Sequence, residues 1–77
     1  MAQAYILIQT EVGRASAVAS DVAGIAGVSR AEDVTGPYDV IVQVATDALG
    51  DTVRAVQKVP GITRTLTCPV VGAPASA

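Results

Sequence analysis

The spacing of apolar residues along the first half of the chain predicts three elements. Residues 5–12 are rich in β-branched and aromatic residues, which is typical of a strand. From residue 14 to residue 26 the apolar positions recur at intervals of three and four, which predicts an amphipathic helix. Residues 28–34 are more polar and predict a second strand. The first half therefore has the order strand, helix, strand.

The second half of the chain repeats this order. An apolar run at residues 40–45 predicts a third strand. Apolar positions spaced along residues 49–59 predict a second helix, and Pro60-Gly61 ends it. Residues 62–71 predict the last strand. We expect residues 1–71 to form a single domain and residues 72–77 to form a flexible tail.

The two halves superpose at an offset of 34 positions, which indicates an internal repeat. Residues 6–9 lie over residues 40–43, and residues 27–30 lie over residues 61–64. Two strand-helix-strand units in tandem predict an α+β fold of the ferredoxin-like βαββαβ type. Right-handed connections then place both helices on one face of a four-stranded antiparallel sheet, with the first and third strands in its centre.

Strand alternation predicts which side chains point away from the helices. On the central strands the inward set is Ile6, Ile8, Val40, Val42 and Val44, and the outward set is Tyr5, Leu7, Gln9, Ile41 and Gln43. We expect Thr63, Thr65 and Thr67 of the last strand on the outward face as well. An uncovered sheet face that is half apolar suits pairing with a second copy of the chain.

Two arginines occupy equivalent positions in the repeat. Arg30 comes two positions after Val28, and Arg64 comes two positions after Ile62. Residues two positions apart in a regular strand point to the same face, so one residue of each of these two pairs must lie outside the regular pleat. A β-bulge or a late strand start would achieve this. Their recurrence favours a scaffold role such as intersubunit pairing, with an anion site as the alternative.

The composition limits the classes of function. A chain of 77 residues has room for one compact domain, and a hydrophobic fraction of 51% predicts a folded core. Because a domain of this size is marginally stable alone, we expect it to oligomerise. A net charge of −2 argues against direct nucleic-acid binding. No stretch approaches the roughly 20 apolar residues that span a membrane.

Histidine is absent, and Cys68 is the single cysteine. The chain therefore lacks the side chain most often used for proton transfer and for metal ligation. One cysteine forms neither an intramolecular disulfide nor a Cys-x-x-Cys metal site, which favours a reducing cytoplasm. We expect no enzymatic activity, no catalytic residue, no metal and no cofactor, and we expect Cys68 to be buried as a small hydrophobic residue.

The segment between the halves, Gly36-Pro37-Tyr38-Asp39, carries the candidate chemistry. Glycine and proline together are typical of a hairpin turn. Asp39 then has two interpretations, since its carboxylate can bond nearby backbone amides or bind a ligand. Tyr38 is interpreted first as an interface or core anchor.

These motifs together resemble the effector domain of the Lrp/AsnC family, also called the RAM domain. The likeness includes Thr-Gly-x-Tyr-Asp at residues 35–39, an apolar strand, a helix that ends in Pro60-Gly61, and Ile-Thr-Arg-Thr-x-Thr at residues 62–67. It extends from about Ala4 to Val71, almost the whole chain.

The resemblance implies a function and a set of site residues. Family members are cytoplasmic proteins that pair through their sheet faces, and the dimers assemble into rings, commonly octamers. Amino acids or similar small metabolites bind where dimers meet. By position, Gly36 and Tyr38 would belong to the effector loop, Asp39 would be the acidic residue of the effector response, and Thr65 and Thr67 would be the polar pair on the last strand.

Two departures from the family pattern change this expectation. The resemblance begins near residue 4, so we expect a stand-alone module without the helix-turn-helix, which does not bind DNA itself and modulates full-length Lrp/AsnC regulators. Pro37 also removes one amide donor from the loop. The alternatives are a structural oligomer without a ligand and, ranked last, a dimeric α+β barrel enzyme, because the chain has no His, Trp or Asn.

Overall fold

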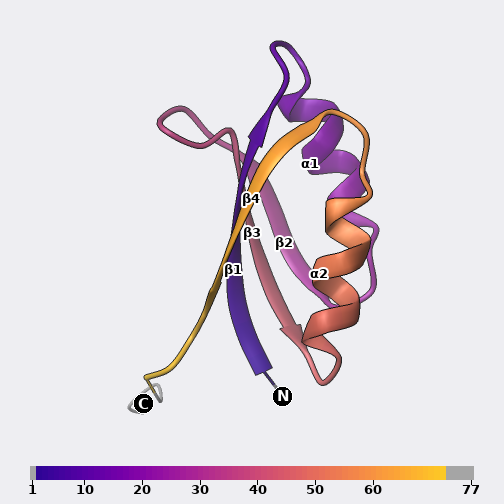
Figure 1. The fold of residues 1–77 in the computed structure, drawn as a ribbon, viewed down its shortest axis with the longest axis vertical. Helices are drawn as coiled ribbons and strands as arrows, with labels where there is room; N and C mark the ends of the chain where they lie inside the picture. The colour runs from indigo at the N-terminus through magenta and orange to yellow at the C-terminus, as the bar shows by residue number, and fades with distance from the viewer. Residues whose placement is uncertain (1, 73–77) are drawn as a thin grey trace.

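A computed structural model describes residues 2–72, and the remainder of the expected tail, residues 73–77, lies outside the described residues (Figure 1). Residues 2–72 form four strands and two helices in the predicted order β-α-β-β-α-β. They are β1 (Ala2–Thr10), α1 (Ala15–Ala23), β2 (Val28–Asp33), β3 (Val40–Thr46), α2 (Leu49–Gln57) and β4 (Ile62–Pro69).

The strands form one antiparallel sheet with the order β2-β3-β1-β4. The first and third strands are therefore central, as the repeat predicts. Both helices lie on the same side of this sheet, and the other side is left uncovered (Figure 1). This arrangement confirms the ferredoxin-like fold.

The core lies between the sheet and the helices and consists almost entirely of small branched residues. Ile6 and Ile8 are fully buried, and so are Val18 and Val22 of α1 and Val56 of α2. The three alternate valines of β3 complete it: Val40, Val42 and Val44. Branched side chains pack well on a pleated surface, which explains how a core without aromatic rings fills this layer.

The uncovered side of the sheet is called the open face below. Cross-strand pairing of Tyr5 with Gln43 and of Leu7 with Ile41 places the predicted outward residues of the central strands on it. From the edge strands it receives Arg30, Glu32, Arg64, Leu66 and Cys68. The alternation predicted for the central strands is thus confirmed.

The edge strand β4 differs from the prediction. Thr65 lies opposite Ile8 and Thr67 lies opposite Ile6, so both threonines share the helix-facing side of the sheet. The expectation that they line the open face is wrong, because the register of β4 opposes them to the two buried isoleucines. The expectation of a buried Cys68 is also wrong, since this residue is exposed and lies opposite Tyr5.

A register shift at equivalent positions of the repeat explains the two arginines. One shift falls between Val28 and Arg30 in β2, and the other falls in β4 just before Arg64. The bulge expected from the sequence is therefore present in both edge strands. As a result Arg30 lies opposite Gln43 and Arg64 lies opposite Gln9, both on the open face.

Both helices end earlier than their apolar pattern predicts, and they end in the same way. After α1 the amide of Ile25 donates to the carbonyl of Val22 at 3.0 Å, and after α2 the amide of Val59 donates to the carbonyl of Val56 at 3.1 Å. These bonds span three residues, so each final turn is tighter than an α-helix. The apolar residues that follow Ala23 belong to the turn after α1, so the apolar pattern in the sequence extends beyond the end of this helix.

The turn after each helix requires glycine. Gly27 and Gly61 have φ values of 95° and 94° and are equivalent in the repeat. A Cβ at Gly27 would lie 2.7 Å from the Thr52 hydroxyl oxygen, and one at Gly61 would lie 3.2 Å from a Val18 methyl carbon. Both glycines allow the backbone of the turn to approach a helix closely.

We expect Gly27→Ala to lower the free energy of unfolding by about 2–4 kcal/mol, because it adds both left-handed strain and a steric clash. Gly13→Ala is the matched control, since Gly13 also has a positive φ of 78° but no atom within 4 Å of the added carbon. The control should lower the free energy of unfolding only by the cost of the strain, about 1 kcal/mol. Urea unfolding of both variants checks this, and equal losses would contradict it.

Candidate functional site

The loop between β2 and β3 is held to the end of β1 by Asp39. One carboxylate oxygen of Asp39, Oδ2, accepts the backbone amide of Thr10 at 2.8 Å and the Thr10 hydroxyl at 3.3 Å. The backbone amide of Asp39 donates to the Ile8 carbonyl at 2.8 Å, and its carbonyl accepts the Val34 amide at 2.8 Å. Asp39 therefore closes the loop and attaches it to the central strand.

A second contact connects the loop to the open face. Gln9 projects from this face and its side-chain amide donates to the Pro37 carbonyl at 3.0 Å. The loop thus receives hydrogen bonds from two consecutive residues of β1, Gln9 and Thr10. Since β1 is the central strand beside β3, the loop position is set by the sheet itself.

The loop still offers groups to a ligand. Asp39 is half-buried, and its second carboxylate oxygen, Oδ1, has no hydrogen-bond partner among residues 2–72. Gly36 is exposed and Tyr38 is half-buried beside it. A carboxylate oxygen of this kind can accept an ammonium group, and exposed loop amides can donate to a carboxylate. Pro37 contributes no amide to this set.

Thr65 and Thr67 lie apart from the loop, on the far side of β1. Ile8 pairs with both Val40 and Thr65, so the residue after Asp39 and the nearer threonine are about 10 Å apart at this end of the sheet. The Thr65 hydroxyl accepts the Gln57 side-chain amide at 3.4 Å from α2. One chain therefore brings Gly36, Tyr38 and Asp39 together but keeps the two threonines in a separate group.

The surface beside Thr65 is hollowed. An open depression of about 270 Å³ is lined by Gln57, Ile62, Thr63, Arg64 and Thr65. The Thr63 hydroxyl donates to the Gln9 carbonyl at 3.2 Å, which holds the start of β4 to β1. Both hydroxyl groups that line the depression, those of Thr63 and Thr65, therefore already form hydrogen bonds within the chain.

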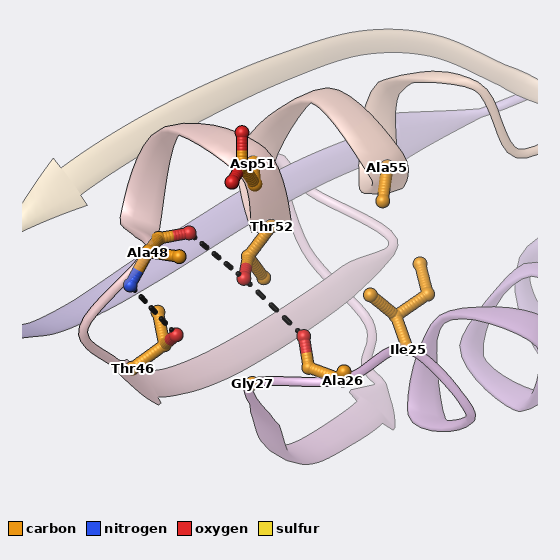
Figure 2. Close-up of a pocket in the computed structure, with 8 residues that line it drawn as sticks. All are labelled: Ile25, Ala26, Gly27, Thr46, Ala48, Asp51, Thr52 and Ala55. Atoms are coloured by element: carbon orange, nitrogen blue, oxygen red, sulfur yellow. Dashed lines mark hydrogen bonds between the residues drawn. The ribbon is translucent and has the colours of Figure 1, made fainter.

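A further hollow lies between the two turns that precede β2 and α2, and the sequence did not indicate it (Figure 2). Its volume is about 300 Å³, and the residues that line it are mainly small and apolar. Figure 2 shows the Thr52 hydroxyl between the carbonyls of Ala26 and Ala48, at 3.2 and 3.3 Å. Thr52 is buried and joins the two turns, so its polar group has a structural role.

The position of Thr52 in the repeat is a feature of the sequence that indicates its structural role. It stands where the first half of the repeat has Val18, which is fully buried in the core. A hydroxyl at a core position of a repeat usually has a hydrogen-bond partner. Here that partner comes from the opposite half of the chain, the carbonyl of Ala26.

Residues 2–72 were searched for clusters of metal-ligating side chains and for helices able to cross a membrane. No group of three or more His, Cys, Asp or Glu side chains is placed there to hold a metal ion. In the same part of the chain neither helix has the length and the apolar content that crossing a bilayer requires.

The sheet order, with both helices on one face, defines a ferredoxin-like domain. The chain matches the model of the Lrp/AsnC ligand binding domain over residues 3–76 and belongs to that family. The resemblance stated from the sequence is confirmed.

Solved structures agree with this assignment. TTHA0845 from Thermus thermophilus is 30% identical, with a TM-score of 0.87, and the match covers 95% of this chain and 96% of that one. The hypothetical protein PHS023 from Pyrococcus horikoshii is 31% identical, with a TM-score of 0.78, and the match covers 96% of this chain and 94% of that one.

E. coli AsnC shares the fold at 22% identity and a TM-score of 0.80, and the match covers 95% of this chain and 52% of AsnC. The chain thus spans about half the length of that protein. No curated protein matches the chain significantly.

Asp39→Ala should lower the free energy of unfolding by about 1–3 kcal/mol, because the Thr10 amide loses a charged acceptor. Asp39→Asn should lower the free energy of unfolding less, since the side-chain amide oxygen of asparagine can still accept the hydrogen bond from the Thr10 amide. Asp33→Asn is the control for the change in charge, because Asp33 is exposed on the edge strand β2. Urea unfolding measures all three, and equal stability of Asp39→Ala and the unsubstituted chain would contradict the anchoring role.

Proposed function

We propose that this protein is an effector-binding module that senses a free amino acid or a similar small metabolite in the cytoplasm. It self-associates through the open face, its dimers form a ring such as an octamer, and it modulates full-length Lrp/AsnC regulators without binding DNA itself. In this proposal it acts by binding and carries out no reaction.

The observation that carries the proposal is the match to the Lrp/AsnC ligand binding domain over residues 3–76. Two features of the chain support it. The loop that holds Gly36, Tyr38 and Asp39 presents a carboxylate oxygen with no partner among the described residues. The open face is partly apolar and is left uncovered by the helices.

The chemistry of an amino acid fits these groups. In the proposed site the free oxygen of Asp39 accepts the ligand ammonium group, and loop amides donate to the ligand carboxylate. Tyr38 provides one apolar wall. Thr65 and Thr67 lie beyond β1 in the same chain, so in this proposal they reach the ligand from a neighbouring copy.

A structural oligomer without a ligand is the second candidate. The observation that favours it is the Asp39–Thr10 contact, since one carboxylate oxygen already accepts two hydrogen bonds within the chain. Pro37 also reduces the donors available to a ligand carboxylate. In this candidate Asp39 holds the loop and nothing more.

A thermal-shift panel of the twenty amino acids separates the two candidates. An effector at one hundred times its Kd should stabilise the fold by about 2.7 kcal/mol, which raises the Tm by several degrees. Asp39→Asn should remove this shift while the fold is retained, and Asp33→Asn should keep it. A flat panel for the unsubstituted chain would favour the structural oligomer.

Two substitutions by glutamate, one on the open face and one control elsewhere, test pairing through this face. Leu66→Glu places a carboxylate on the β4 side of this face, where the leucine is 42% exposed, and should convert the oligomer into smaller species. Val12→Glu is the control, because Val12 is fully exposed in the loop before α1, away from the open face. Sedimentation equilibrium gives the masses, and an unchanged mass for Leu66→Glu would exclude pairing through this face.

A further inference from the structure

The loop between β2 and β3 contains a peptide unit whose orientation is fixed by β1. The Pro37 carbonyl accepts the side-chain amide of Gln9 at 3.0 Å, so it is turned towards that strand. No peptide bond among the described residues is cis, and in a trans peptide the carbonyl and the amide hydrogen point in opposite directions. The amide of Tyr38, which belongs to the same peptide unit, therefore points away from Gln9.

This amide is free to bind a ligand. The Tyr38 N–H has no hydrogen-bond partner among residues 2–72, whereas the next amide, that of Asp39, donates to the Ile8 carbonyl at 2.8 Å. Pro37 has no amide hydrogen. A hydrogen bond accepted by the carbonyl of a peptide unit also polarises that unit, which strengthens its N–H as a donor. The contact with Gln9 thus affects both the direction and the strength of the Tyr38 donor.

A free acceptor lies on the adjacent residue. The Thr10 backbone amide donates to one carboxylate oxygen of Asp39, Oδ2, at 2.8 Å, and the other oxygen, Oδ1, has no hydrogen-bond partner among residues 2–72. Consecutive residues of β1 therefore each hold one group of the loop, since Gln9 orients the Tyr38 donor and Thr10 orients the Asp39 acceptor. An α-amino acid carries its ammonium and carboxylate groups on one carbon, so a donor and an acceptor on adjacent residues match both. Groups held in place before binding lose less conformational entropy when the ligand binds.

The internal repeat provides a comparison for Gln9. Gln43 occupies the equivalent position in the second half of the chain. Its side-chain amide donates to the Tyr5 hydroxyl at 3.4 Å, so it stays on the open face. Gln9 instead follows Ile8, the last residue of β1 that pairs with β3, and its side chain reaches the loop at this end of the sheet. The contact with Pro37 therefore results from the place of Gln9 at the end of the paired strands.

We propose that Gln9 is a positioning residue of the effector site. Its side-chain amide turns the Pro37–Tyr38 peptide unit so that the Tyr38 N–H donates to the carboxylate of a bound amino acid, while the free oxygen of Asp39 accepts the ammonium group. The inference rests on the proposed function and adds the donor for the ligand carboxylate and the residue that orients this donor. Gln9 itself does not touch the ligand. An amine without a carboxylate then gains nothing from Gln9, so this residue contributes to specificity for amino acids.

Removal of the side-chain donor of Gln9 tests this role in the full chain. The probes are the amino acid that gives the largest shift in the thermal-shift panel, and the amine that has the same side chain but no carboxylate. Gln9→Met keeps the length of the side chain but has no N–H group, so it should raise the Kd of the amino acid about tenfold and leave the Kd of the amine unchanged. Gln43→Met is the matched control and should change neither Kd. Isothermal titration calorimetry gives each Kd, and circular dichroism confirms that each variant is folded.

The Tyr38 amide also gives a spectroscopic readout. In isotope-labelled protein its proton resonance should move downfield when the amino acid is added, because the amide then donates to a carboxylate. The amine should leave this resonance in place. Gln9→Met should reduce the movement that the amino acid causes, and Gln43→Met should not.

The outcomes separate this inference from the proposed function. A Gln9→Met variant that binds like Gln43→Met, or that binds the amino acid and the amine with equally raised Kd values, would overturn the positioning role. The proposed function would stand in that case, because the unsubstituted chain still binds the amino acid. A flat panel for the unsubstituted chain would remove the proposed function and this inference together.

Discussion

Two helices of nine residues each cover one face of a four-stranded sheet, and this constraint determines the rest of the molecule. The helices pack their valines against the isoleucines and valines of the two central strands. Right-handed connections put both helices on the same side, so no element among residues 2–72 is left to cover the other. Side chains on that open face therefore remain exposed unless a second molecule packs on them.

The internal repeat produces the same local structural features in both halves of the chain. Each helix ends in a tightened turn, and each turn ends at a glycine, Gly27 or Gly61, with a positive φ. A register shift then follows in each edge strand. These shifts reverse the side-chain alternation locally, which carries Arg30 and Arg64 to the open face. The charge pattern of that face is thus a consequence of backbone irregularity in the two edge strands.

The candidate effector loop depends on the same sheet. It is attached to β1 by Thr10 and Gln9, residues that lie 29 and 28 positions from their partners Asp39 and Pro37. Contacts over such separations exist only after β1 and β3 have paired. Gln9 also belongs to the open face, so the surface proposed for pairing and the loop proposed for binding share one residue of the central strand.

The amino-acid sequence by itself determined the element order, the repeat and the inward residues of the central strands, because helices and strands have different apolar periods. Tertiary structure decided what periodicity cannot encode. Pairing with β1 turned Thr65 and Thr67 towards the helices and left Cys68 exposed. Distant contacts gave Asp39 its partner Thr10 and gave Thr52 its partner in the other half of the repeat. Strand register and hydrogen bonds between remote residues arise from tertiary packing. The local pattern of apolar residues therefore does not predict them.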